Sequence, residues 1–230
     1  MDKHIFRKWV IDMKVVITGT AKGIGLETAR VFLEMGHDVI GIDELPQPES
    51  LRHRQYKHVI ADVSDESSLP HIPGVQILIN NAGVQNDGRD ISVNLLGTVN
   101  CTEKYGIQPH IKSIVNVAST SAHTGAEFPL YAASKGGVLA YTKNVAMRVA
   151  KHGATCNSIS PGGVITEMNE HIIKDEKLWA AVMNETLLPK WATAHEIAMW
   201  IYFVACMNSS MTGQDIIIDN GEMAKSNFIW

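Results

Sequence analysis

Short apolar runs rich in β-branched residues recur along the chain, and each is followed by a turn rich in Gly, Asn or Ser. Runs of this length, bounded by turn residues, predict β-strands. Successive positions are apolar, as in parallel strands that helices cover on both faces. Seven strands are predicted, at Lys14–Thr18, His37–Ile42, Lys57–Ala61, Val75–Asn80, Ser113–Ala118, Thr155–Ser160 and Asp215–Asp219.

Helical patterns fill the intervals between the strands, and alternating strands and helices predict an α/β fold. We expect a doubly wound, mainly parallel sheet of seven strands with helices on both faces, and ligands at the carboxyl ends of the strands. The segment Glu167–Pro189 is helical in pattern but rich in charge and Met, so it predicts a mobile flap and not a core helix. The main helices are predicted at Ile24–Met35, about Ser92–Gln108, about Tyr131–Lys151 and His195–Cys206.

The composition fits one domain, residues 1–230, with one sizeable core. The chain is 45% hydrophobic and 19% charged, with a formal net charge of -4. This mild acidity offers no basic stripe for nucleic acid, and no apolar run reaches the roughly 18 residues of a membrane span. Residues 1–12 lack an apolar stretch of signal-peptide length, and an ordered edge, a frayed terminus and an N-terminal extension ahead of Met13 are the open interpretations. A cytoplasmic protein is expected.

The cysteines and histidines do not predict a metal site. Cys101, Cys156 and Cys206 are widely scattered and form no C-x-x-C pair, which argues against a disulfide framework or a zinc site. The ten histidines include no pair with metal-ligand spacing. A reduced compartment fits this cysteine pattern best.

Three glycines stand where the first strand turns into the first helix, in the segment ITGTAKGIG, Ile17–Gly25. Helix N-terminal N–H groups and the positive end of the helix dipole favour a pyrophosphate there, and glycine lets it approach the backbone. The spacing of Gly19, Gly23 and Gly25 departs from the G-x-G-x-x-G fingerprint. A turn without a ligand is the alternative for this motif alone.

Polar residues also end the next strands. Asp43, eighteen residues beyond Gly25, stands near the position where an acidic side chain accepts hydrogen bonds from an adenosine ribose. Asp62 is predicted to bond adenine with Val63 packed on it, or else to cap the following segment. The small residues of Asn80–Gly83 leave room for a flat ring, and the asparagine amides can join neighbouring strand ends. A solvated turn is the alternative at Asp43 and at Asn80–Gly83.

Tyr131 and Lys135 are four residues apart and share one face of a helix. A phenol titrates near pH 10, about three units above neutrality, unless a neighbouring cation favours its anion, so this pair suits acid–base chemistry. Ser119, at the end of the fifth strand, faces the same crevice and is placed to steady charge on a substrate oxygen. Thr120 and Ser121 are alternatives for that role.

Asn94 lies within the apolar stretch Ile91–Gly97. An unpaired buried amide is costly, so we expect its side chain to find partners. A cap or a helix bend is one role for Asn94, and a place in the active site is the other.

Seven motifs, in order along about Lys14–Gly221, resemble the short-chain dehydrogenase/reductase family in its compact single-domain form. They are T-G-x-x-x-G-I-G at Thr18–Gly25, N-N-A-G at Asn80–Gly83, V-N-L around Asn94, Ser119, Y-x-A-S-K at Tyr131–Lys135, P-G-G-V-I-T at Pro161–Thr166 and T-G-Q-D-I-I-I-D-N-G at Thr212–Gly221. The resemblance implies a Rossmann-type fold. It also implies hydride transfer between a nicotinamide cofactor and an alcohol or ketone substrate.

The resemblance further implies a catalytic tetrad. Tyr131 would be the general acid/base, and Lys135 would lower its pKa and hold the nicotinamide ribose. Ser119 would orient the substrate oxygen, and Asn94 would anchor a water in a proton relay. The implied cofactor-binding residues are Gly19, Lys22, Gly23, Ile24, Gly25, Asp43, Asp62, Val63, Asn81, Ala82, Gly83, Tyr131, Lys135, Pro161, Gly162, Val164 and Thr166.

Lys22 and Asp43 favour different cofactors. In the family, a basic residue just before the second glycine often accompanies a 2′-phosphate, and an acid after the second strand accompanies bare ribose hydroxyls. Asp43 would lie directly against a 2′-phosphate, whereas the long Lys22 can turn to solvent. NAD is therefore predicted, with NADP less favoured.

The chain departs from the family between Gly83 and Asn94, where it has only ten residues, fewer than usual. The region Asp43–Val75 is also lean. These two short segments are expected to leave less protein around the adenosine and along one edge of the substrate pocket. The helix around Asn94 is expected to begin late.

Two other functions stay open. A dinucleotide-sensing binding protein would carry a broken tetrad, and an epimerase or dehydratase of this fold usually has a longer substrate domain. Apolar faces on the helices of Asn94 and Tyr131 exceed what one sheet face buries, which together with the resemblance predicts a homotetramer or homodimer. Residues expected to face a mixed, partly apolar substrate pocket are His123, Glu127, Phe128, Met168, Trp179 and Met183.

Overall fold

Seven parallel strands form the central sheet of the computed structural model, which describes residues 12–126 and 128–225. The strand order is β3-β2-β1-β4-β5-β6-β9, so the predicted doubly wound α/β fold is confirmed. A small second sheet pairs β7 (Val164–Ile165) with β8 (Ala192–Thr193). The strands of the central sheet are β1 (Lys14–Thr18), β2 (Asp38–Asp43), β3 (Tyr56–Ile60), β4 (Ile77–Asn80), β5 (Ser113–Val117), β6 (Thr155–Pro161) and β9 (Asp215–Ile218).

Successive side chains of the central strands enter two different cores, one on each face of the sheet. Val15 and Ile17 of β1 belong to the core under α2 (Gly23–Glu34) and α8 (Ala194–Tyr202). Val16 between them belongs to the opposite core, under α5 (Pro129–Val149). Because both faces are covered, the strands are apolar at every position and not at alternate ones.

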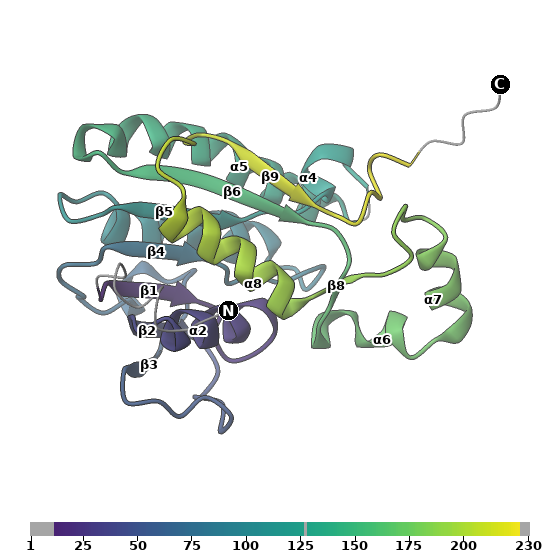
Figure 1. Ribbon diagram of the computed structural model, residues 1–230, viewed down its shortest axis with the longest axis horizontal. Helices are drawn as coiled ribbons and strands as arrows, with labels where there is room; N and C mark the ends of the chain where they lie inside the picture. The colour runs from purple at the N-terminus through teal and green to yellow at the C-terminus, as the bar shows by residue number, and fades with distance from the viewer. Residues whose placement is uncertain (1–11, 127, 226–230) are drawn as a thin grey trace, which may run out of the picture.

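The helices lie in two layers around the sheet (Figure 1). Figure 1 shows α2 and α8 in front of the strands and α5 behind them, while α6 and α7 extend beside the sheet. None of the helices in the described part of the chain is long and apolar enough to cross a membrane. The remaining helical elements are η1 (Glu66–Ser68), η2 (Asp90–Leu96), α3 (Gly97–Cys101), η3 (Thr102–Gly106), α4 (Ser121–Thr124), η4 (Ala150–His152), η5 (Glu167–Asn169), α6 (Glu170–Ile173), α7 (Glu176–Met183) and η6 (Phe203–Met207).

The predicted elements agree with the structure apart from their ends and a few short pieces. The helix predicted at Ser92–Gln108 consists of two π-helical stretches, η2 and η3, around the short α3, and it begins at Asp90, two residues before the predicted start. Its first residue, Asp90, is buried, and the Asp90 carboxylate accepts a hydrogen bond from the Asn86 N–H, 2.8 Å away. The two-residue strands β7 and β8 were missed because they are too short to carry a pattern.

The strand order reverses between β1 and β4, which makes the carboxyl edge beside them the switch point of the sheet. Chain connections leave these two strands in opposite directions, so a crevice opens there. The glycine turn, Asp43, Asn80–Gly83 and Ser119 all follow the carboxyl ends of strands at or next to that crevice. The fold therefore gathers the predicted motifs at one edge.

Candidate active site

The glycine turn has the backbone shape that the sequence motif requires. Gly19 and Gly23 have φ of 75° and 59°, in the left-handed region that favours glycine. A Cβ on Gly25 would lie 1.9 Å from the Gly19 carbonyl oxygen. Lys22 is the exposed N-cap residue of α2 and makes no side-chain cap, so its side chain does not occupy the first N–H groups of the helix, the groups that bind a pyrophosphate in sites of this kind.

Asp43 is held in place at the end of β2. Its Oδ2 accepts a hydrogen bond from the Ala21 N–H at 2.8 Å, and its Oδ1 accepts from the Leu45 N–H at 2.9 Å. The carboxylate is therefore tied to the glycine turn itself. This orientation suits the acceptance of hydrogen bonds from ribose hydroxyls beside the turn.

A chain of hydrogen bonds braces this end of the site, and the sequence analysis missed it. The Thr20 and Tyr56 hydroxyls are 2.9 Å apart, and the Tyr56 hydroxyl is 2.8 Å from His58 Nδ1. His58 Nε2 bonds the Leu45 carbonyl at 2.9 Å. A Cβ on Gly41 would lie 2.2 Å from the Tyr56 hydroxyl, so this glycine makes room for the chain. The bonds join the glycine turn to the segment after Asp43.

Asp62 caps its own turn, as the alternative prediction proposed. Its Oδ1 accepts hydrogen bonds from the N–H and the hydroxyl of Ser64, both at 2.8 Å. Val63 packs against Gly97, where a Cβ would lie 2.6 Å from the valine methyl. Both Asp62 and Val63 nevertheless line the cavity described below.

The asparagines after β4 join neighbouring strand ends, as predicted. Asn80 Nδ2 donates to Asn116 Oδ1 of β5 at 2.8 Å. Asn81 Nδ2 donates to the Thr18 carbonyl of β1 at 3.0 Å, and the Ala82 N–H donates to the Thr18 hydroxyl. These bonds fix the floor of the crevice where β1, β4 and β5 end.

Lys135 is almost fully buried beside Tyr131. Its Nζ donates to the Val117 carbonyl at 2.8 Å and lies 5.8 Å from the centre of the Tyr131 ring. Burial lowers the pKa of Lys135 to about 8. The spacing of four residues on α5 therefore places a cation next to the phenol, a geometry that favours a phenolate.

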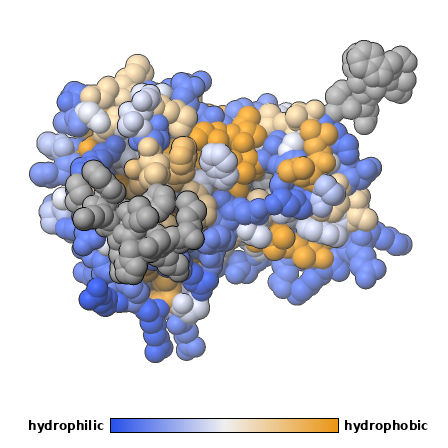
Figure 2. Space-filling model, in the orientation of Figure 1, coloured by the Kyte–Doolittle hydropathy of each residue, from blue (hydrophilic) through white to orange (hydrophobic). Residues whose placement is uncertain are grey.

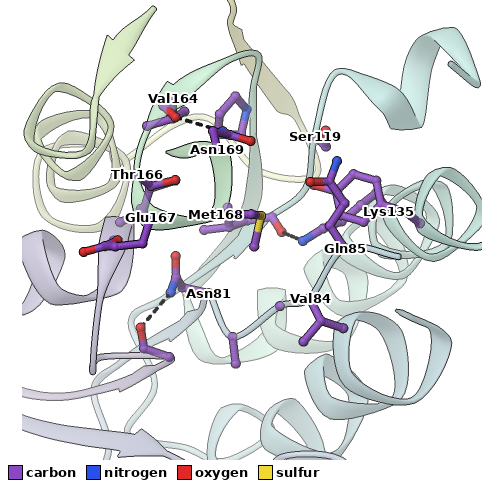
Figure 3. Close-up of a pocket in the computed structure, with 18 of the residues that line it drawn as sticks. Asn81, Val84, Gln85, Ser119, Lys135, Val164, Thr166, Glu167, Met168 and Asn169 are labelled. Atoms are coloured by element: carbon purple, nitrogen blue, oxygen red, sulfur yellow. Dashed lines mark hydrogen bonds between the residues drawn. The ribbon is translucent and has the colours of Figure 1, made fainter. Parts of the chain in front are cut away.

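Ser119 faces the same space from the end of β5. Its hydroxyl donates to Ser121 Oγ at 3.3 Å and accepts from the Ser121 N–H at 3.2 Å. Thr120 and Ser121 line the cavity as well, so the position alone does not separate the three hydroxyls. Figure 3 shows Ser119, Gln85 and Lys135 on one side of the pocket, with Thr166, Glu167 and Met168 across from them.

Asn94 lies behind the cavity, and its side-chain amide bonds to two neighbouring segments. Its Oδ1 accepts from the Val84 N–H at 2.8 Å and its Nδ2 donates to the Val84 carbonyl at 2.9 Å. Nδ2 also donates to the Ser134 hydroxyl at 3.0 Å. The buried amide in the π-helix η2 thus clamps the segment after Gly83 and joins it to α5.

One cavity of about 810 Å³ brings the predicted residues together. All of them line it except Gly25 and Asn94, which lie behind its wall. Its volume is in the range of small-molecule and cofactor sites, and the glycine positions leave the backbone accessible to a dinucleotide. Lining residues that the sequence analysis did not single out include Glu44, Leu45, Asn86, Asp87, Gly163, Glu185, Trp191 and Glu222.

The residues expected to face the substrate are only partly in that position. Phe128 and Met168 line the cavity. Trp179 does not, because its ring packs edge-on against Trp191 at 5.3 Å. His123 is also away from the cavity, where its Nε2 lies 2.8 Å from Asp215 Oδ2. Met183 is not a lining residue, and Glu127 lies outside the described residues.

The described residues include no group of three or more His, Cys, Asp or Glu side chains that could hold a metal ion. The cavity lining includes the tyrosine, the lysine and several hydroxyls that can act on a substrate oxygen. Such a site can hold a carbonyl or alcohol oxygen and exchange a proton with it.

The burial of Lys135 predicts a pH-dependent stability. The unfolded chain keeps the lysine proton up to about pH 10.4, whereas the folded protein loses it near pH 8. Between these values the unfolded state binds more protons, so stability rises with pH. Relative to Lys135→Met, the free energy of unfolding of the wild type should increase by roughly 2 to 3 kcal/mol between about pH 7 and pH 10.

Urea unfolding followed by circular dichroism measures this difference. The buried cysteines and tyrosines titrate equally in both proteins, so their contribution to the free energy of unfolding cancels in the comparison. Lys143→Met is the matched control, because Lys143 is exposed on the same helix. A wild-type advantage over Lys135→Met that stays constant with pH would contradict the burial argument.

Comparison with known proteins finds relatives among dehydrogenases and reductases. A family model described as enoyl-(acyl carrier protein) reductase matches residues 19–222. The short chain dehydrogenase adrF of Penicillium roqueforti is 36% identical over 181 residues, 67% of this chain and 71% of the relative. The structure of 4-hydroxyisoleucine dehydrogenase complexed with NADH is 27% identical, with a TM-score of 0.82. The structure of ElxO with NADP bound is 26% identical, also with a TM-score of 0.82; each alignment covers 94% of this chain and 100% of the other.

The fold and the site define a nicotinamide-dependent oxidoreductase. The chain belongs to the short-chain dehydrogenase/reductase family, as its seven motifs predicted.

Proposed function

We propose that this protein is an NAD-dependent dehydrogenase or reductase that interconverts an alcohol and a ketone. The observation that carries the proposal is the Tyr131–Lys135 pair in one cavity with Ser119 and the glycine turn. A bound nicotinamide would supply the hydride-transfer chemistry. The Tyr131 hydroxyl would give its proton to the substrate oxygen in reduction and take it back in oxidation.

The other residues of the site position this proton transfer. Lys135, held on the Val117 carbonyl, favours the phenolate of Tyr131 by charge. The Ser119 hydroxyl would hold the substrate oxygen as its charge changes. Asn94 would act by fixing the cavity wall, because its amide is used by Val84 and Ser134.

NAD is the proposed cofactor, in preference to NADP. Support comes from Asp43, whose carboxylate is held beside the glycine turn by two N–H groups. A second acid, Glu44, lines the cavity next to it. The Asp43 carboxylate, held beside the ribose position, opposes a 2′-phosphate more strongly than the exposed Lys22, which can turn to solvent, attracts it.

The test is a panel of secondary alcohols, polyols and ketones assayed separately with NAD and NADP by nicotinamide absorbance. Turnover of one class, faster with NAD, supports the proposal. Tight NAD binding without turnover of any member would support a dinucleotide sensor. Product formation without net change in nicotinamide absorbance would support an epimerase or dehydratase.

The cavity lining also predicts the charge of the substrate. Among the described lining residues the lysines and arginines are Lys22 and Lys135, both assigned to the cofactor, whereas Glu185 and Glu222 lie toward the lid. Apart from the His171 imidazole, no further basic side chain of the described lining is there to pair with a buried anionic substrate group. Ketones without charge should therefore have kcat/KM about tenfold or more above analogues that carry a carboxylate. A preference for the carboxylate analogues in the same panel would be evidence against this assignment.

We propose a single cytoplasmic domain, with residues 167–190 as the substrate lid, that assembles as a homotetramer or homodimer. Figure 2 shows apolar side chains gathered over α8 and β9. Exposed apolar residues in and just after these elements include Trp200 (44%), Phe203 (48%) and Ile217 (42%). Burying such a patch between copies is favourable.

Light scattering is expected to give two or four times the mass of one chain. Phe203→Glu, which places a charge in the apolar patch, should shift the protein toward smaller species. A wild-type protein that is stable as a monomer would remove the oligomer from the account.

A further inference from the structure

The shortened segment between Gly83 and Asn94 is braced at both ends. Asn94 holds both backbone groups of Val84, and the buried carboxylate of Asp90 accepts from the Asn86 N–H at 2.8 Å. With only ten residues between Gly83 and Asn94, the chain has little freedom in this segment. It therefore presents its side chains to the cavity rim from a fixed backbone.

Arg89 stands on this braced segment with its guanidinium held on two edges. Asp87 Oδ1 accepts from the Arg89 N–H at 2.8 Å, and Asp87 Oδ2 accepts from Nε at 3.2 Å. The opposite edge faces Glu44, with Nη1 to Oε2 at 3.0 Å and Nη2 to Oε1 at 3.3 Å. Two parallel bonds of this kind are the geometry with which arginine takes either a carboxylate or a phosphate.

The pair spans the crevice at its adenosine end. Glu44 follows Asp43 at the end of β2, and Arg89 follows β4, with β1 lying between these two strands. Two strand spacings are about 10 Å, so the side chains reach toward each other over the end of β1. Glu44 and Asp87 both line the cavity. The guanidinium is thus at the rim beside Asp43, where the proposed function puts the adenosine ribose.

We propose that Arg89 is a preformed anion site for the ribose 2′ position, that Glu44 occupies it, and that this occupation makes the protein select NAD over NADP. The proposal rests on the proposed function, which places the ribose at Asp43. While Glu44 is paired with the guanidinium, the charges of Arg89 and Glu44 cancel, and a 2′-phosphate meets the Asp43 carboxylate with no guanidinium edge free to bind it. Without the Glu44 charge, the Nη1–Nη2 edge of the Arg89 guanidinium, still oriented by Asp87, is available to the phosphate.

The pair is suited to such a test because its loss should not disturb the fold. Both side chains are well exposed, 43% for Arg89 and 47% for Glu44, and exposed ion pairs contribute little to stability. Glu44→Gln keeps the size of the side chain and removes its charge. Glu49→Gln is the matched control, because Glu49 is an exposed acid of the same segment that does not line the cavity.

The experiment measures the Kd of NADH and of NADPH by fluorescence titration for the wild type, Glu44→Gln, Arg89→Gln, the double variant and Glu49→Gln. Glu44→Gln should tighten NADPH binding by about tenfold or more, the value of a charge-assisted hydrogen bond, and change NADH binding by less than about threefold. Adding Arg89→Gln should remove that gain. Glu49→Gln should change neither cofactor.

Two results would overturn the proposal. If Glu44→Gln and the double variant gained NADPH affinity equally, the gain would come only from the loss of repulsion between Glu44 and the phosphate. If Glu44→Gln gained no NADPH affinity, the Arg89–Glu44 pair would not govern the choice between NAD and NADP. If the wild type bound neither cofactor, the proposed function itself would fail. NADH binding with unchanged discrimination would refute only the role of Arg89 and Glu44.

Discussion

Replacing Tyr131 with Phe is expected to lower kcat/KM by about a thousandfold, because it removes the only proton that the proposed mechanism exchanges with the substrate oxygen. The ring stays, so its contact with Lys135 Nζ, 5.8 Å from the ring centre, is kept. The Kd of NADH should change by less than about threefold, since no more than one hydrogen bond to the cofactor is lost. Steady-state kinetics on the best substrate of the panel, with fluorescence titration of NADH, measure both effects.

Tyr141→Phe is the matched control for this variant. Tyr141 lies on the same helix, and its hydroxyl bonds Glu103 at 2.9 Å, away from the cavity. Loss of this half-buried hydroxyl should leave kcat/KM within about a factor of two, because Tyr141 lies away from the site. Undiminished activity in Tyr131→Phe would contradict Tyr131 as the general acid/base, even if NAD is the cofactor.

Replacing Gly25 with Ala should weaken cofactor binding strongly and destabilise the fold. The new Cβ would lie 1.9 Å from the Gly19 carbonyl oxygen and 2.5 Å from Asn81 Nδ2. These are backbone and floor atoms of the site, so the glycine turn must move. We expect the Kd of NADH to rise by about a hundredfold and the free energy of unfolding to fall by about 2 kcal/mol or more.

Gly136→Ala provides the same substitution where there is room for it. In α5 the nearest atom to a Cβ on Gly136 is the Ala122 carbonyl oxygen at 4.0 Å. Alanine in a helix interior is favoured over glycine by about 1 kcal/mol, so this variant should be at least as stable as the wild type. Titration of NADH and urea unfolding compare the two, and normal NADH affinity in Gly25→Ala would contradict the proposed pyrophosphate site.

The parts of the site that sequence reasoning found are those set by local chain geometry. The glycines of the turn and the four-residue spacing of Tyr131 and Lys135 depend on a few neighbouring residues. The strands were recognisable because burial on both faces leaves continuous apolar runs. The joining of strand ends by Asn80 and Asn81 followed from amide chemistry at a sheet edge.

The parts it missed depend on contacts between distant segments. Asn94 reaches Ser134, forty positions along the chain, and Arg89 reaches Glu44, forty-five positions away. Gly163 leaves space for the Trp191 ring, which a Cβ would approach to 2.0 Å. No period or spacing in the sequence signals such pairs, because each is created only when the strands assemble.

The central claim is that a hydride passes between a nicotinamide and a substrate carbon in this cavity. The most direct measurement uses NADH carrying deuterium at C4 of the nicotinamide, in each of its two stereochemical forms, with a ketone that the wild type reduces. Mass spectrometry of the alcohol should find one deuterium per molecule from one form and none from the other, because the cofactor is held in one orientation. Alcohol product without deuterium from either form would contradict the account.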